Sequence, residues 1–159
     1  MNQGGIKALE FYKTLEGQSE GTGDWYEMTQ AKIDAFAEAT LDFAEIHVNP
    51  EAAARGPFGT TIAHGLFTLS LVPHLVLHLC QHPEAAAGST GGANIGFNRV
   101  RMPAPVPVNT RIRGHVRFVK VEQKGDALEF TREVTVELEG AERPALVAEW
   151  IFRTFYAGD

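Results

Sequence analysis

The stretch Gly65–Cys80, GLFTLSLVPHLVLHLC, is almost continuously apolar and decides which fold the rest of the chain can adopt. At 16 residues it is shorter than the roughly 20 residues of a helix that crosses a membrane, and it contains Pro73, His74 and His78. An element that is apolar on every side is typical of a helix enclosed by the remainder of a domain. The sequence therefore predicts a buried central helix that ends near Pro83.

Four later segments are rich in Val, Ile, Phe and Thr, and three of them alternate cleanly between apolar and polar residues. In one, Arg111 and Arg113 fall on one side of the predicted strand and Ile112 falls on the other. Breaks such as EQKGDA and EGAERP are typical of short hairpins. We therefore expect an antiparallel sheet with one solvent-exposed face and one covered face. The segments are 93–102, 110–123, 127–140 and 144–156.

The covered face of this sheet needs an apolar partner, and only the segment at 65–80 is apolar enough to supply one. We therefore expect an α+β fold in which a curved antiparallel β-sheet wraps around a long central α-helix. The 159 residues, 44% of them apolar, are expected to form a single domain. Further helices are expected at 28–40, capped by Thr29, and at 48–55, where Asn49 suits the cap and Pro50 the first turn.

The charge and cysteine content narrow the possible partners and the compartment. A formal net charge of −6 argues against nucleic acid or an anionic membrane as a partner, because both require a cationic face. Cys80 is the only cysteine, so an internal disulfide is excluded and a reducing compartment is expected. The first residues lack the apolar core of a signal peptide. We expect a cytoplasmic protein without a membrane segment.

Asp42 and His47, in the segment DFAEIH, are residue types that can perform acid–base chemistry together. Their spacing of five is unsuitable for both regular structures. On a helix the side chains would lie about 140° apart, and on a strand they would occupy opposite faces. The pair can act together only if the chain bends between them.

The segment DFAEIHVNPEAAARGPFGTTIAHGLFTLSL, residues 42–71, resembles the hydratase motif of the MaoC-like dehydratases, the family that includes (R)-specific enoyl-CoA hydratases. The segments GPFGTTIAHG, GFNRVRMPAPVPV and AEWIFRTFY resemble its NodN-like branch more narrowly. The resemblance extends from about residue 25 to residue 156. It implies the hot-dog fold, a homodimer, and a tunnel near the subunit interface for the pantetheine arm of a thioester.

This resemblance also assigns site residues. The catalytic aspartate and histidine of the motif fall on Asp42 and His47, and the oxyanion-binding glycine falls on Gly65, after His64. Such enzymes are hydro-lyases that reversibly add water to a trans-2-enoyl thioester to form an (R)-3-hydroxyacyl thioester. The substrate would be a thioester of CoA or of acyl-carrier protein, and the family requires no metal or redox cofactor.

These residue types suit the reaction. Asp42 and His47 could hold one water, so that one takes its proton and the other returns a proton to Cα on the same face, giving syn addition. The sequence leaves open which residue is the base. The amide of Gly65, at the start of the central helix, could meet the charge on the thioester oxygen. A side chain at Gly65 would obstruct the close approach of a ligand.

The chain departs from the family pattern around the aspartate. Leu41 stands where the family usually has glycine, and we expect it to make the bend with ordinary backbone torsions. Ala44 and Glu45 stand where the family often has Asn-Pro or Gln-Trp. By analogy with the family, the chain leaves its helix at Asp42 and bends back to present His47.

Several other polar residues are weaker candidates. His64 either packs or forms a hydrogen bond in its turn, or it contributes to the oxyanion site. Arg99 and Arg101 are candidates to meet the phosphates of CoA, although arginines on strands are usually just solvated. Three histidines spaced by four resemble a metal-binding pattern, but no carboxylate or cysteine joins them, so we expect structural or interfacial roles and no metal. They are His74, His78 and His82.

Two other functions remain open. Several hot-dog thioesterases carry a catalytic Asp or Glu on the central helix, whereas residues 62–82 here contain neither. The altered residues around Asp42 also leave room for a non-catalytic module that binds acyl thioesters.

Overall fold

A computed structural model describes residues 1–156 of the chain. Its helices are α1 (Gln3–Lys13), α2 (Gln30–Thr40), α3 (Glu45–Val48), α4 (Pro50–Ala54), α5 (Gly65–Ser70), α6 (Val72–Val76) and α7 (Pro83–Ala86), with a 3-10 turn, η1 (Leu77–Cys80). Its strands are β1 (Ser19–Thr22), β2 (Tyr26–Met28), β3 (Gly91–Arg101), β4 (Thr110–Lys124), β5 (Ala127–Leu138) and β6 (Leu146–Phe155).

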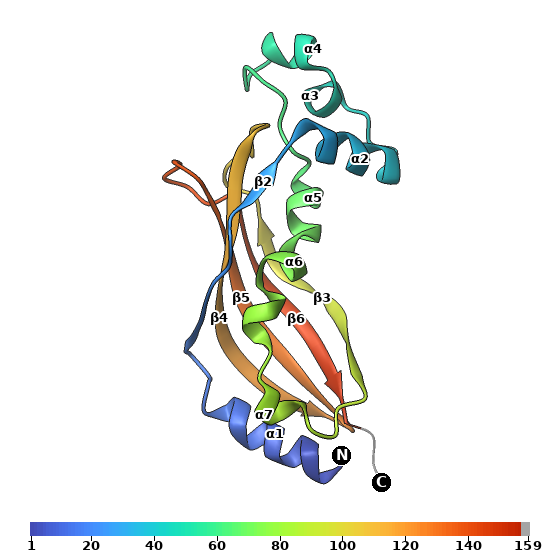
Figure 1. Ribbon diagram of the computed structural model, residues 1–159, viewed down its shortest axis with the longest axis vertical. Coiled ribbons are helices and arrows are strands. Elements are labelled where there is room, and N and C mark those ends of the chain that lie inside the picture. The colour runs from blue at the N-terminus through green and yellow to red at the C-terminus, as the bar shows by residue number, and fades with distance from the viewer. Residues whose placement is uncertain (157–159) are drawn as a thin grey trace.

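The strands form one antiparallel sheet in the order β1-β4-β5-β6-β3, and β2 pairs with β4 beside β1. Figure 1 shows the long strands curving around the helical segments α5 and α6. The four strands expected from the alternating pattern are confirmed. The short strands β1 and β2 and the helix α1 were not predicted.

The two faces of the sheet differ as the alternation on β4 indicates. On the outer face, Arg111 pairs with Glu139 and Arg113 pairs with Glu137 across the β4–β5 ladder. Exposed ion pairs of this kind are screened by solvent and add little stability, so they keep the face solvated rather than hold the fold together. On the inner face, Ile112 is fully buried in the main core.

The buried helical element is the main feature that the sequence did not predict correctly. It is three short pieces, α5, α6 and η1, rather than one long helix. Pro73 has no N–H to donate to the preceding turn, which accounts for the break between α5 and α6. The element still fills the core, because a Cβ atom added to Gly114 of β4 would overlap the side chain of Val76.

The two ends of the molecule carry different elements. Helices α2, α3 and α4 lie at one end, and α1 and α7 at the other (Figure 1). Between η1 and the sheet, Pro83–Ala86 form the short helix α7, and β3 begins at Gly91. Within residues 1–156, no helix combines the length and the hydropathy that crossing a membrane requires.

Candidate active site

The chain bends sharply between α2 and α3, as the spacing of Asp42 and His47 requires. Helix α2 ends at Thr40, and Leu41 then adopts the left-handed conformation with φ 61° and ψ 27°. His47 lies in α3, which begins three residues after Asp42. The expectation of ordinary torsions at Leu41 was therefore wrong: the bend uses the conformation that glycine adopts most easily.

Replacement of Leu41 by glycine is expected to stabilise the protein by about 0.5–1 kcal/mol. The left-handed conformation is strained for leucine, and the side chain is 77% exposed, so little buried contact would be lost. Leu41→Ala is the matched control, because alanine removes the same side chain but keeps the backbone strain. Urea denaturation would measure both variants, and a glycine variant less stable than the alanine variant would contradict this expectation.

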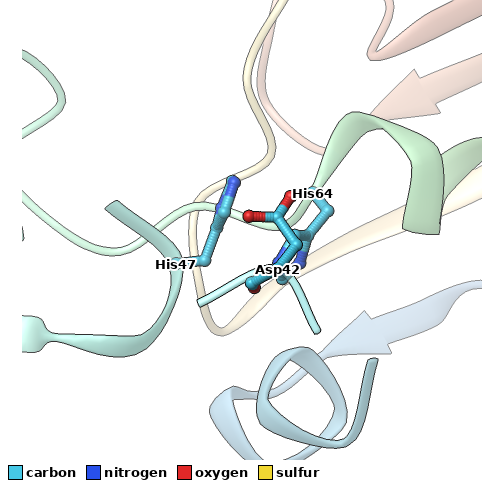
Figure 2. Close-up of side chains that lie close together, drawn as sticks. All are labelled: Asp42, His47 and His64. Atoms are coloured by element: carbon cyan, nitrogen blue, oxygen red, sulfur yellow. The ribbon is translucent and has the colours of Figure 1, made fainter. Parts of the chain in front are cut away.

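The bend brings Asp42 and His47 together with a third residue, His64. One carboxylate oxygen of Asp42 and one ring nitrogen of each histidine all lie within 4.8 Å of one another (Figure 2). The two imidazole rings stack with their centroids 3.8 Å apart. Asp42 is exposed, whereas His47 and His64 are buried. The bend thus places the exposed carboxylate of Asp42 close to two stacked, buried imidazoles.

Hydrogen bonding determines which nitrogen of His47 carries a proton. Its Nδ1 lies 2.7 Å from the carbonyl oxygen of Ile62, and because a carbonyl can only accept, Nδ1 must be the donor. In the neutral ring Nε2 is then the acceptor, and in the charged ring Nε2 is the second donor. Nε2 is therefore the atom of His47 that can exchange a proton with a ligand.

The position of α3 is fixed by Gln30, which sequence reasoning missed. The side-chain amide of Gln30 donates to the carbonyl oxygen of His47 at 2.7 Å, and its oxygen accepts from the Thr61 hydroxyl at 2.6 Å. The amide of Ile62 also donates to the carbonyl oxygen of Ile46 at 3.0 Å. These bonds tie the histidine-bearing turn to the segment that leads into α5.

Gly65 is the first residue of α5 and directly follows His64. Helix geometry leaves an amide at this position without a partner inside the helix. α5 has only six residues. The dipole that acts at Gly65 is therefore that of a short helix, and not that of the long helix that the sequence predicted. The space that a Cβ atom on Gly65 would occupy holds the side chain of Met102, which follows β3 and is 42% exposed.

Arg99 and Arg101 lie near the end of β3 that leads to Met102. Arg99 has a positive φ of 51° at an irregularity in the β3–β6 register, and its guanidinium is paired with Glu149 at 3.1 Å. The guanidinium of Arg101 donates to the adjacent carbonyl of Val100. Across residues 1–156, no hydrogen bond links either arginine to Asp42 or His47.

The three evenly spaced histidines have different neighbours. His74 packs edge-on against Tyr26, and His82 lies 3.2 Å from a carboxylate oxygen of Glu20. His78 lies beside Gly23. His74 lies in α6, His78 lies in the 3-10 turn η1, and His82 lies in the segment before α7, so the three do not share one helix face.

Comparison with known families identifies the chain. Residues 12–140 match the sequence profile described as the MaoC like domain. The chain belongs to the MaoC-like dehydratase family. This family places the chain among the hydro-lyases, and it agrees with the motif recognised around Asp42 and His47.

Among relatives of this MaoC-like chain, 3-hydroxyacyl-thioester dehydratase Z of Mycobacterium tuberculosis is 48% identical over 139 residues, covering 86% of this chain and 89% of that protein. Nodulation protein N of Rhizobium leguminosarum bv. viciae is 44% identical over 137 residues, covering 85% and 83%. In fold, the chain is similar to the (R)-hydratase from A. caviae involved in PHA biosynthesis. The TM-score is 0.68 at 21% identity, over 86% of this chain and 94% of that one. The hot-dog fold is thereby confirmed.

Proposed function

We propose that this MaoC-like protein is an (R)-specific enoyl-CoA hydratase, which in reverse acts as an (R)-3-hydroxyacyl-thioester dehydratase. The observation that carries the proposal is the bend that brings the Asp42 carboxylate to His47 despite their spacing. The 48% identity to a protein named as a 3-hydroxyacyl-thioester dehydratase supports the same substrate class.

In this mechanism Asp42 and His47 hold one water between them above the double bond of the substrate. One residue takes a proton from the water as its oxygen bonds to Cβ, and the other gives a proton to Cα. A proton then passes from the first residue to the second, which restores the starting state. Because the two residues share one water, we assign both to one side of the substrate, and the two additions then occur on the same face.

The thioester oxygen gains negative charge as water adds, and the Gly65 amide is the donor that we assign to it. This amide is one residue from His64, and His64 contacts the backbone of Asp42. A backbone donor fixed at this position stabilises the enolate without reorganisation, which is how oxyanion sites lower reaction barriers. The reaction as proposed uses no metal or redox cofactor.

The substrate would be a thioester of CoA or of acyl-carrier protein. Arg101 is the better of the two candidates to meet its phosphates, since Arg99 is already paired with Glu149. The exposed apolar side chains near the dyad suit an apolar acyl or pantetheine chain. They are Leu41, Phe43, Ile46, Leu66 and Met102.

We also propose that the protein is a homodimer. Within residues 1–156, β3 is an edge strand that pairs only with β6, and Ile95 on it is 46% exposed. Light scattering is expected to give about twice the 17.4 kDa mass of one chain. A monomer that is still fully active at micromolar concentration would contradict a site that depends on the subunit interface.

One assay with crotonyl-CoA distinguishes this function from its two alternatives. Hydration removes the absorbance of the conjugated thioester and releases no thiol. A thioesterase would release free thiol, and a non-catalytic binding module would do neither. The lack of any Asp or Glu from Ile62 to His82 weighs against the thioesterase, so we expect absorbance to fall without thiol release.

A further inference from the structure

His64 is buried, with 3% of its surface exposed, and it contacts both members of the proposed dyad. Its Nε2 lies 3.0 Å from the backbone carbonyl oxygen of Asp42. Its ring stacks on His47 with an interplanar angle of 28°, and Phe36 of α2 packs against it with ring centroids 5.0 Å apart. One imidazole therefore links α2, the Asp42 loop and α3.

The hydrogen bonds of His64 define its tautomer. The carbonyl of Asp42 can only accept, so Nε2 of His64 carries the proton. Its Nδ1 is buried and has no hydrogen-bond partner among the described residues. A proton on Nδ1 would be a buried donor without an acceptor, which is costly. Because Nε2 is bonded to this carbonyl and Nδ1 is buried, we assign no proton exchange with a substrate to His64.

The loop around Asp42 has few other anchors. Among the described side-chain contacts, the carboxylate of Asp42 accepts one long hydrogen bond of 3.4 Å, from the amide of Ala44. Leu41 and Phe43 on either side are 77% and 49% exposed. An exposed loop of this kind can occupy several conformations unless a specific contact holds it. Within residues 1–156, the 3.0 Å bond from His64 is the shortest hydrogen bond between a side chain and residues 41–44.

We infer that His64 is a positioning residue: its Nε2–H bond to the carbonyl of Asp42, together with its stacking on His47, sets the separation of the acid and the base. The inference rests on the proposed function, because it concerns the geometry of that dyad. A misplacement of about 1 Å in a catalytic group can lower turnover roughly 10²-fold. The role assigned to His64 therefore affects kcat more than KM.

Two amide variants of His64 test whether the hydrogen bond to Asp42 is needed, or only a polar side chain at this position. The amide nitrogen of glutamine can reach the place of Nε2, whereas that of asparagine reaches only the place of Nδ1. We expect His64→Asn to lower kcat by at least about 10-fold with KM changed less than threefold, and His64→Gln to keep kcat within about threefold of wild type. Equal losses of kcat in the two variants would overturn the inference.

A second readout does not depend on activity. Chymotrypsin should cleave after Leu41 or Phe43 faster in His64→Asn than in wild type, because the loop loses its anchor, while His64→Gln should stay close to wild type. Unchanged cleavage in folded His64→Asn would also overturn the inference.

Failure of the proposed function would look different. If Asp42→Asn is fully active while His64→Asn still loosens the loop, the dyad is wrong and the contact of His64 with the loop stands. If Asp42→Asn is inactive and the two His64 variants behave alike, the dyad stands and the positioning role fails.

Discussion

Asp42→Asn and His47→Ala are each expected to lower hydratase turnover by at least about 10²-fold. Asparagine keeps the shape of the Asp42 side chain but cannot take or give a proton at neutral pH. Alanine removes Nε2 of His47, the nitrogen left for proton exchange once Nδ1 donates to Ile62. Steady-state hydration of crotonyl-CoA would measure both losses.

The double variant is expected to be little worse than the less active single variant. Two groups that act on one shared water form a unit, and the effects of removing them are not additive. Circular dichroism should show that each variant is folded, as expected for Asp42, whose side chain is exposed. Near-wild-type turnover in either single variant would reject the assignment of the dyad.

Gly65→Pro is expected to lower turnover by about 10² to 10³-fold, because proline removes the amide that we assign to the thioester oxygen. The backbone can accept this change. Proline is tolerated in the first turn of a helix, and His64 before it has φ −58° and ψ 134°, the extended region that a residue before proline requires.

Gly65→Ala is the matched control, because alanine keeps the N–H and adds only a methyl group. That methyl group would overlap Met102, so both variants are best compared in a Met102→Ala background. If the amide stabilises the oxyanion, the proline variant loses far more turnover than the alanine variant. Equal losses in folded proteins would mean that Gly65 serves close packing against its neighbours.

The architecture was predictable because it follows from patterns that a single strand or helix displays. The alternation along β4 and the apolar run from Gly65 to Cys80 require a sheet with one covered face and an element to cover it. The break in that element was harder to predict. Pro73 was visible in the sequence, yet whether a proline bends a helix or ends it depends on how the surrounding core side chains pack.

The dyad could be located from its motif, but its geometry could not be derived from the sequence. Its orientation depends on contacts between residues that are distant in the chain. Gln30 fixes the carbonyl of His47, and His64 fixes that of Asp42. The left-handed Leu41 was missed because leucine seldom adopts that conformation, and the surrounding structure must impose it. The contact between Met102 and Gly65 could not be predicted from the sequence, because it depends on where β3 lies relative to α5.

The stereochemistry of hydration in D₂O tests most directly the claim that Asp42 and His47 handle one water on one face of the substrate. The product formed from crotonyl-CoA would be isolated, and NMR would give the configuration at C3 and the position of deuterium at C2. We expect the (R)-3-hydroxybutyryl thioester with deuterium and hydroxyl added to the same face. Addition to opposite faces, or an (S) product, would contradict the proposed mechanism.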